Sequence, residues 1–213
     1  MTDPYQALME KLDQTPTGAP KTEHLEKILK ILFTEEEAKI ASQLPLNPLR
    51  QPISKLAEKI GMEKEKLEPV LENLADKGLV YCAPKEGEKA YALLPLFPGI
   101  FELQFMRAEY DPKSKALAKL FNDYYFHGWG KSSLEFKTPF TRTIPIEKAI
   151  SPGQQVASYQ KVEELITDSK SLAITNCFCR HEHELLGDWC GRPKEVCMIL
   201  GPFADFAVER GFA

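Results

Sequence analysis

Four of the five cysteines of the chain lie close together near its C-terminal end. They are Cys177, Cys179, Cys190 and Cys197, which gives the spacing Cys-x-Cys, ten residues, Cys, six residues, Cys. Five cysteines in 213 residues are too few for a disulfide scaffold, and clustering of this kind is typical of metal or redox chemistry. We therefore expect the four thiols to converge on one site, around which the C-terminal part of the chain must fold.

The identity of the bound group does not follow from the number of ligands, because four thiolates complete either a structural zinc site or an iron-sulfur cubane. If Cys177 and Cys179 both lie on extended backbone, their side chains share a face, with α-carbons about 6 to 7 Å apart. That span suits two irons better than one zinc ion. We favour an iron-sulfur cluster of the 4Fe-4S type. Zinc is the alternative, with His181 or His183 in place of a cysteine in one version, and a redox dithiol is a further possibility.

Charged and aromatic side chains between the cysteines are compatible with a buried anionic cluster. Arg180 and Arg192 would lower the desolvation cost of such an anion, and Trp189 would shield it from water. We place His181 and His183 beside the site rather than among its ligands, because a histidine in a soluble protein is more often a surface or core residue than a ligand. These residues form an expected outer layer around the four thiols.

The N-terminal part divides at a cluster of helix-breaking residues. Residues 15–20 (TPTGAP) separate a short helical pattern from the rest of the chain, so we expect residues 1–20 to form a loosely packed arm. From residue 21 an apolar stripe predicts a helix through residue 33. Thr34 with Glu37 three positions later has the pattern of a capping box that opens the next helix, which should end before Pro45.

Residues 51–94 show the order helix, turn, helix and hairpin. The run ISKLAEKIGMEKEKLEPVLENLADKGLVYC within it resembles the winged helix-turn-helix domains of bacterial regulators. We therefore assign residues 21–106 to a winged-helix-like domain, in which Cys82 is a buried strand thiol. The second helix of the motif carries five acidic side chains against three lysines, whereas a DNA reader presents a basic face. DNA binding is possible but disfavoured, and a protein-docking role is preferred.

The remaining segments complete an α+β protein. Residues 107–133 form a helical connector that ends in Tyr124, Tyr125, Phe126 and Trp129, for which packing between domains is favoured over lining a ligand pocket. Residues 134–213 form a small mixed α/β cysteine-rich domain. It has an extended stretch at 136–146, a helix at 156–166, a strand at 172–175 and a helix at 203–210.

Composition and motifs exclude several classes of function. A formal net charge of −4 gives no overall attraction to nucleic acid or to an anionic membrane. The N-terminus lacks a signal-peptide pattern, and prolines and a glutamate interrupt the most apolar stretch at residues 90–106, so we expect a cytoplasmic protein without membrane spans. No phosphate loop, dinucleotide fingerprint or Ser-His-Asp set is present. His127 is an isolated candidate base, and a packed or surface histidine is its preferred interpretation, so an enzyme is not the favoured class.

The run CFCRHEHELLGDWCGRPKEVCMILG resembles a family of ferredoxin-type, 4Fe-4S-binding proteins found mainly in anaerobic microbes. In that family a winged-helix-like segment and this cysteine-rich segment precede a pair of ferredoxin motifs. The resemblance covers residues 172–210 closely and residues 21–106 more loosely, and the chain looks like the part before the ferredoxin motifs. It implies electron transfer, with the four cysteines as ligands and a redox partner protein or a further ferredoxin domain as the partner. The alternative is a winged-helix transcriptional regulator with a zinc or redox-sensing cysteine site.

Overall fold

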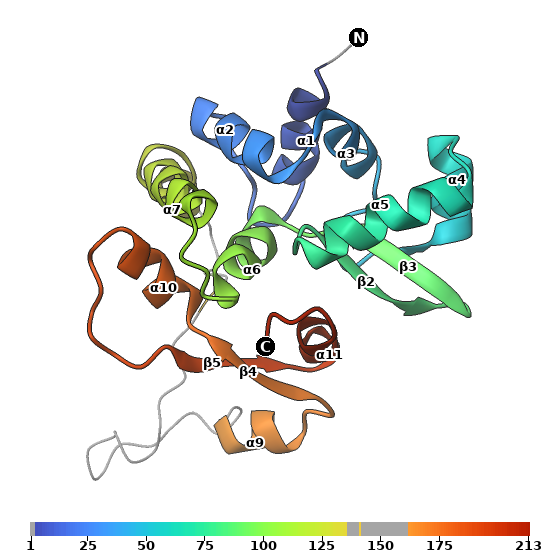
Figure 1. The fold of residues 1–213 in the computed structure, drawn as a ribbon. Helices are drawn as coiled ribbons and strands as arrows, with labels where there is room; N and C mark the ends of the chain where they lie inside the picture. Colours follow the sequence, from blue (N-terminus) through green and yellow to red (C-terminus); the bar gives the residue numbers. More distant parts are fainter. Residues whose placement is uncertain (1–2, 136–140, 142–161) are drawn as a thin grey trace.

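The computed structural model describes residues 3–135, 141 and 162–213, and these form an α+β protein (Figure 1). Helices surround two small antiparallel sheets. The strand expected at residues 136–146 lies outside the described residues except for Thr141. The helix expected at residues 156–166 is described only from residue 162, where α9 (Val162–Thr167) begins.

Three helices form the N-terminal part: α1 (Pro4–Asp13), α2 (Glu23–Leu32) and α3 (Glu35–Ala41). The predicted capping box is confirmed, because the Thr34 and Glu37 side chains each accept a hydrogen bond from the other residue's backbone N–H. The expected loose packing of residues 1–20 is wrong. Leu8 and Leu12 of α1 have no exposed surface, because α1 packs against both α2 and α3.

The helices and the hairpin expected between residues 51 and 94 are confirmed. Strand β1 (Gln51–Pro52) leads into α4 (Ile53–Ile60) and α5 (Lys64–Asp76), and β2 (Val80–Lys85) and β3 (Glu88–Leu93) follow as a hairpin. The three strands pair antiparallel in the order β1-β3-β2. Cys82 is buried in β2, as predicted.

The central part of the chain joins the N-terminal helices to the cysteine-rich part. It comprises an irregular segment η1 (Leu96–Ile100), α6 (Phe101–Met106), α7 (Pro112–Tyr124), a π-helical turn η2 (Tyr125–Trp129) and α8 (Gly130–Ser133). Helix α7 packs along α2. The indole N–H of Trp129 donates to the Thr17 carbonyl at 2.9 Å, and the Tyr124 hydroxyl donates to the Pro20 carbonyl at 3.1 Å. These bonds fix the end of the N-terminal arm against η2.

The C-terminal part is built on the antiparallel pair β4 (Leu172–Asn176) and β5 (Glu195–Leu200), with α10 (Phe178–Leu185) between them in sequence and α11 (Pro202–Glu209) after them. Strand β4 and α11 were both expected from the sequence. Figure 1 shows α10 beside α6 and α7, and α11 between this sheet and the β2-β3 hairpin. The buried apolar residues form one core that runs from Leu8 to Phe212. Among the described helices, none has the length and apolar character needed to cross a membrane.

Candidate metal centre and adjoining pocket

The Cys-x-Cys pair lies where β4 ends and α10 begins. Cys177 has extended backbone angles (φ −66°, ψ 105°) and is the N-cap of α10, so that Cys179 belongs to the first helical turn. The Cys177 N–H donates to the Lys194 carbonyl at 2.6 Å, and its carbonyl accepts from the His181 N–H at 3.0 Å. The expectation that both cysteines lie on extended backbone is therefore wrong, because the helix starts between them. The spacing alone no longer favours iron over zinc.

Three of the four cysteines lie on adjoining elements around the N-terminus of α10. Cys197 reaches this point from β5, where it pairs with Thr175 of β4. After burial, the neighbouring Cys177 thiol raises the pKa of Cys197 and the backbone N–H of Phe178 lowers it, so both groups lie near the Cys197 sulfur. Cys179 is close enough to both of the other thiols for their charges to act on it. The helix N-terminus offers N–H groups and a favourable dipole to negative charge on these sulfurs.

The pKa values of Cys179 and Cys197 reflect the crowding of these groups. Cys179 is exposed at the surface of the protein, but desolvation of its sulfur by the surrounding atoms, followed by repulsion from Cys177 and Cys197, raises its pKa to about 12. Burial and the neighbouring Cys177 raise the pKa of Cys197 to about 11, although the Phe178 N–H and Arg180 act in the opposite direction. Without a cation, Cys179 and Cys197 keep their protons at neutral pH. A metal that binds them as thiolates must therefore release protons.

Cys190 lies outside any helix or strand, on the exposed loop between α10 and β5. None of the five cysteines is in a disulfide. Within the described residues, no three cysteine, histidine, aspartate or glutamate side chains are arranged around one point as ligands of a single metal ion. The structure thus groups Cys177, Cys179 and Cys197, whereas the convergence of all four thiols stays a prediction.

Two basic residues tie the Cys190 loop to α10. The Arg180 guanidinium donates to the Pro193 carbonyl, and its charge acts on Cys197 against the burial that raises the pKa of that thiol. Lys194 donates to the Glu184 carboxylate at 2.6 Å, and it also donates to the Tyr110 hydroxyl, which lies at 2.5 Å. Of the cysteines, Cys197 is therefore one whose charge Arg180 stabilises, and the place of Arg180 beside a four-cysteine site stays a prediction.

The other expected neighbours of the site have different surroundings. His181 has no exposed surface, and its Nε2 is 2.8 Å from the Glu109 carbonyl, which makes it a core residue. His183 is half-exposed, and its Nε2 lies 3.7 Å from the Glu182 carboxylate. Arg192 and Trp189 are exposed on the loop. His127, the isolated candidate base, stacks against His24 with ring centroids 6.0 Å apart.

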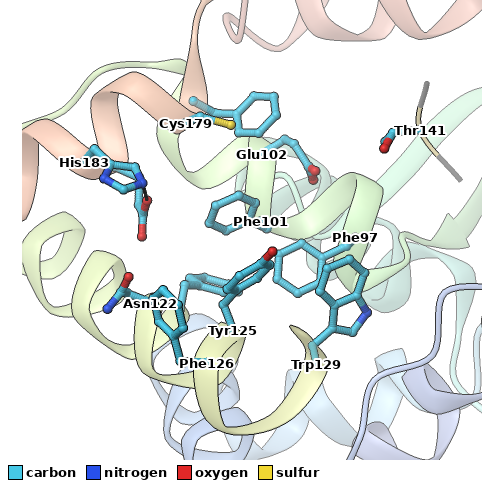
Figure 2. Close-up of a pocket in the computed structure, with 13 residues that line it drawn as sticks. Phe97, Phe101, Glu102, Asn122, Tyr125, Phe126, Trp129, Thr141, Cys179 and His183 are labelled. Carbon is cyan, nitrogen blue, oxygen red and sulfur yellow. Dashed lines mark ion pairs between the residues drawn. The ribbon is translucent and has the colours of Figure 1, made fainter. Parts of the chain in front are cut away.

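An aromatic cavity of about 360 Å³ adjoins the cysteines, and Cys179 forms part of its wall (Figure 2). Its rings come from η1, α6, α7, η2 and α10, and they are Phe97, Phe101, Phe121, Tyr125, Phe126, Trp129 and Phe178. The sequence favoured domain packing for the aromatic cluster at residues 124–129. That interpretation holds for the buried Tyr124, but Tyr125, Phe126 and Trp129 line the cavity. No local sequence pattern predicts the existence of this cavity, because its walls come from segments that are far apart in the sequence.

The cavity also carries polar groups. Figure 2 shows Cys179 and Glu102 near Phe101, with His183 and Asn122 away from Trp129 at the other side. Burial raises the pKa of Glu102 to about 7, although the backbone N–H of Gly99, 2.5 Å from the carboxylate, lowers it. Burial likewise raises the pKa of Glu182 to about 7, with His183 acting against it. Both carboxyls can therefore change charge near neutral pH.

Comparisons with protein-family models, with curated proteins and with solved structures found no match for this chain. Two features of the structure bear on function: three cysteines on the elements around a helix N-terminus, and an aromatic cavity that is lined by one of them, Cys179.

Proposed function

We propose that this chain is a 4Fe-4S electron-transfer protein in which Cys177, Cys179, Cys190 and Cys197 are the cluster ligands. The observation that carries the proposal is that Cys177 and Cys179 begin α10 beside β5, on which Cys197 lies opposite Thr175 at the end of β4. When bound, such a cluster supplies one-electron redox chemistry. The chain's own groups stabilise negative charge on sulfur, through the Phe178 N–H and the Arg180 side chain.

A cluster and a single zinc ion need different arrangements of the same donors. Zinc in a structural site is held by four ligands around one centre, at about 2.3 Å for each thiolate. The described residues offer no such arrangement of three or more donors. A cubane distributes its ligands over several irons, so its thiolates need not surround one point. The loop that carries Cys190 has glycines at 187 and 191 with positive φ, a backbone suited to a chain that folds back over a cluster.

Metal analysis tests the proposal directly. Protein prepared without oxygen should be brown, should contain about four irons and four sulfides per chain, and should absorb broadly near ~400 nm. Each of the single substitutions Cys177→Ser, Cys179→Ser, Cys190→Ser and Cys197→Ser should reduce or abolish the iron content. Cys82→Ala is the matched control, because Cys82 is buried in β2 and should leave iron binding unchanged. Colourless protein with one zinc per chain would refute the cluster.

We further propose that residues 51–94 form a winged helix that docks protein rather than DNA. The lysines of its second helix and of the C-cap of that helix form ion pairs with glutamates of the same chain. Lys64 pairs with Glu88, Lys66 with Glu63 and Lys77 with Glu37. In the hairpin, Lys89 pairs with two glutamates of α5 and Lys85 donates to a backbone carbonyl. These lysines are therefore less available to contact phosphates. Salt-dependent DNA binding by the intact protein would instead support the regulator hypothesis.

A second surface suits a redox partner. The β4-β5 sheet exposes a row of apolar side chains, and they are Leu172, Ile174, Val196, Met198 and Leu200. Leu172 pairs with Leu200 and Ile174 with Met198, so these residues share one face. Contiguous exposed apolar surface commonly marks an interaction site. Cys197 lies on the same strand as three of these residues with its side chain on the opposite face, so one layer of sheet would separate a docked partner from the proposed cluster. We place this chemistry in the cytoplasm, where thiols stay reduced.

A further inference from the structure

The aromatic cavity holds two carboxyl groups for which the described residues provide little positive charge. Glu182 is only 6% exposed, and among the described residues its ion-pair partner is His183, whose Nε2 lies 3.7 Å away. That distance exceeds a normal hydrogen bond. Glu102 accepts a hydrogen bond from the Gly99 N–H but pairs with no lysine or arginine in the described part of the chain. Within residues 3–135, 141 and 162–213, neither lysine nor arginine lines the cavity.

Most of the other residues in the wall are aromatic, and aromatic faces attract cations. Phe97 lies between Trp129, at 4.6 Å between centroids, and Phe101, at 5.0 Å. At the edge of the cavity, Tyr125 is 47% and Phe126 is 61% exposed, an unusual placement for large rings. The negative face of each ring interacts favourably with an ammonium group, and the interaction strengthens when water is excluded.

From these observations we propose that the cavity binds a small organic cation of the methylated ammonium type. An anion would be repelled by Glu102 and Glu182. A neutral aromatic molecule would fill the cavity but would leave the buried Glu182 and the partly buried Glu102 without a charge partner, which is costly. A bare metal ion has no set of three ligands here among the described residues. A methylated ammonium offers positive charge to the carboxyls and apolar methyl groups to the rings. The inference does not depend on the identity of the group bound by the cysteines.

Choline and its uncharged isostere 3,3-dimethylbutan-1-ol test this directly. Isothermal titration of the full chain should show saturable, one-site binding of choline, with a dissociation constant of about 1 mM or lower. The isostere should bind at least about tenfold more weakly, because it lacks the charge. Equal affinity for the two molecules, or no saturable binding of choline, would overturn the proposal.

Three variants locate the site. Glu182→Gln keeps the shape of the side chain and removes its charge, and should weaken choline binding about tenfold. Phe126→Leu keeps an apolar side chain at an exposed position and removes the ring face, and should weaken binding several-fold. Glu209→Gln, on the exposed surface of α11, is the matched control and should bind as the unmodified protein does. Unchanged affinity in both Glu182→Gln and Phe126→Leu would refute the assignment to this cavity. Iron content measured on the same samples separates this result from that of the cluster proposal.

Discussion

Replacing Gly78 with alanine tests how closely the C-terminal end of the chain packs against the turn between α5 and β2. Gly78 has a φ of +71°, and a Cβ added there would lie 2.7 Å from the Leu103 Cβ and 3.0 Å from the Phe212 Cζ. Gly61, at the end of α4, has nearly the same φ of +73° but no atom within 4 Å of the added Cβ. The two glycines therefore share the conformational requirement and differ in the space around them.

The expected losses of stability follow from that difference. Alanine in left-handed backbone costs about 1 to 2 kcal/mol relative to glycine, and this cost applies to both positions. At Gly78 the neighbouring Leu103 and Phe212 must also move, and overpacking of this kind adds about 1 to 3 kcal/mol. Gly61→Ala should thus lose about 1 to 2 kcal/mol of unfolding free energy, and Gly78→Ala about 2 to 5 kcal/mol.

Urea unfolding at neutral pH measures both losses, with the dependence on urea checked to be equal in the two variants. A larger loss for Gly78→Ala than for Gly61→Ala would support close packing of Phe212 and Leu103 against the turn. If the two variants lose the same stability, the contacts of Gly78 contribute nothing, and the reasoning from the added Cβ is refuted.

Two further predictions concern the N-terminal helices. Leu8→Ala should cost about 2 to 5 kcal/mol of unfolding free energy because Leu8 is fully buried, whereas Leu134→Ala, at an 87% exposed position, should change it by about 0.5 kcal/mol or less. Burial raises the pKa of Glu37, but hydrogen bonds from Lys77 and Thr34 outweigh it and hold this pKa below its ordinary value. The stabilisation from the Glu37 carboxylate is therefore present above the pKa of this group in the unfolded chain and is lost as pH falls through its lower pKa in the folded protein. Urea unfolding between about pH 5 and pH 3 should show a smaller loss of stability in Glu37→Gln than in the unmodified protein.

Signals that act within a few residues were sufficient to predict most of the helices and the hairpin. The capping box of Thr34 and Glu37 depends on atoms three residues apart, and it forms as expected. The turn at Gly61 and the stop at Gly78 both use the left-handed backbone that glycine adopts readily. These features depend on no contact with a distant part of the chain, so they could be predicted from the sequence alone.

Features that depend on distant contacts were predicted less well. The breaker cluster at residues 15–20 indicates irregular backbone correctly, yet the arm is held in place by Thr17 and Pro20, whose carbonyls accept bonds from residues more than a hundred positions away. The cavity is likewise built from α6, α7, η2 and α10, so its existence follows from tertiary packing. The assumption that Cys177 and Cys179 both lie on extended backbone is wrong for Cys179. The strand-to-helix connection is short and places the N-cap at Cys177, so Cys179 is helical.

One sequence signal could have indicated that the cavity and the cysteines belong together. Cys179, Glu182 and His183 are spaced three and four apart on α10, so they share one helical face, and all three line the cavity. After burial and the neighbouring thiols, Glu102 and Glu182 also raise the pKa of Cys179, which shows that the carboxyls and the thiol interact electrostatically. A cation held between the carboxyls would offset that repulsion and favour the Cys179 thiolate. Because coupling between two sites is reciprocal, negative charge on the thiolates would in turn strengthen cation binding, so the proposed cluster and the proposed ammonium site would stabilise each other.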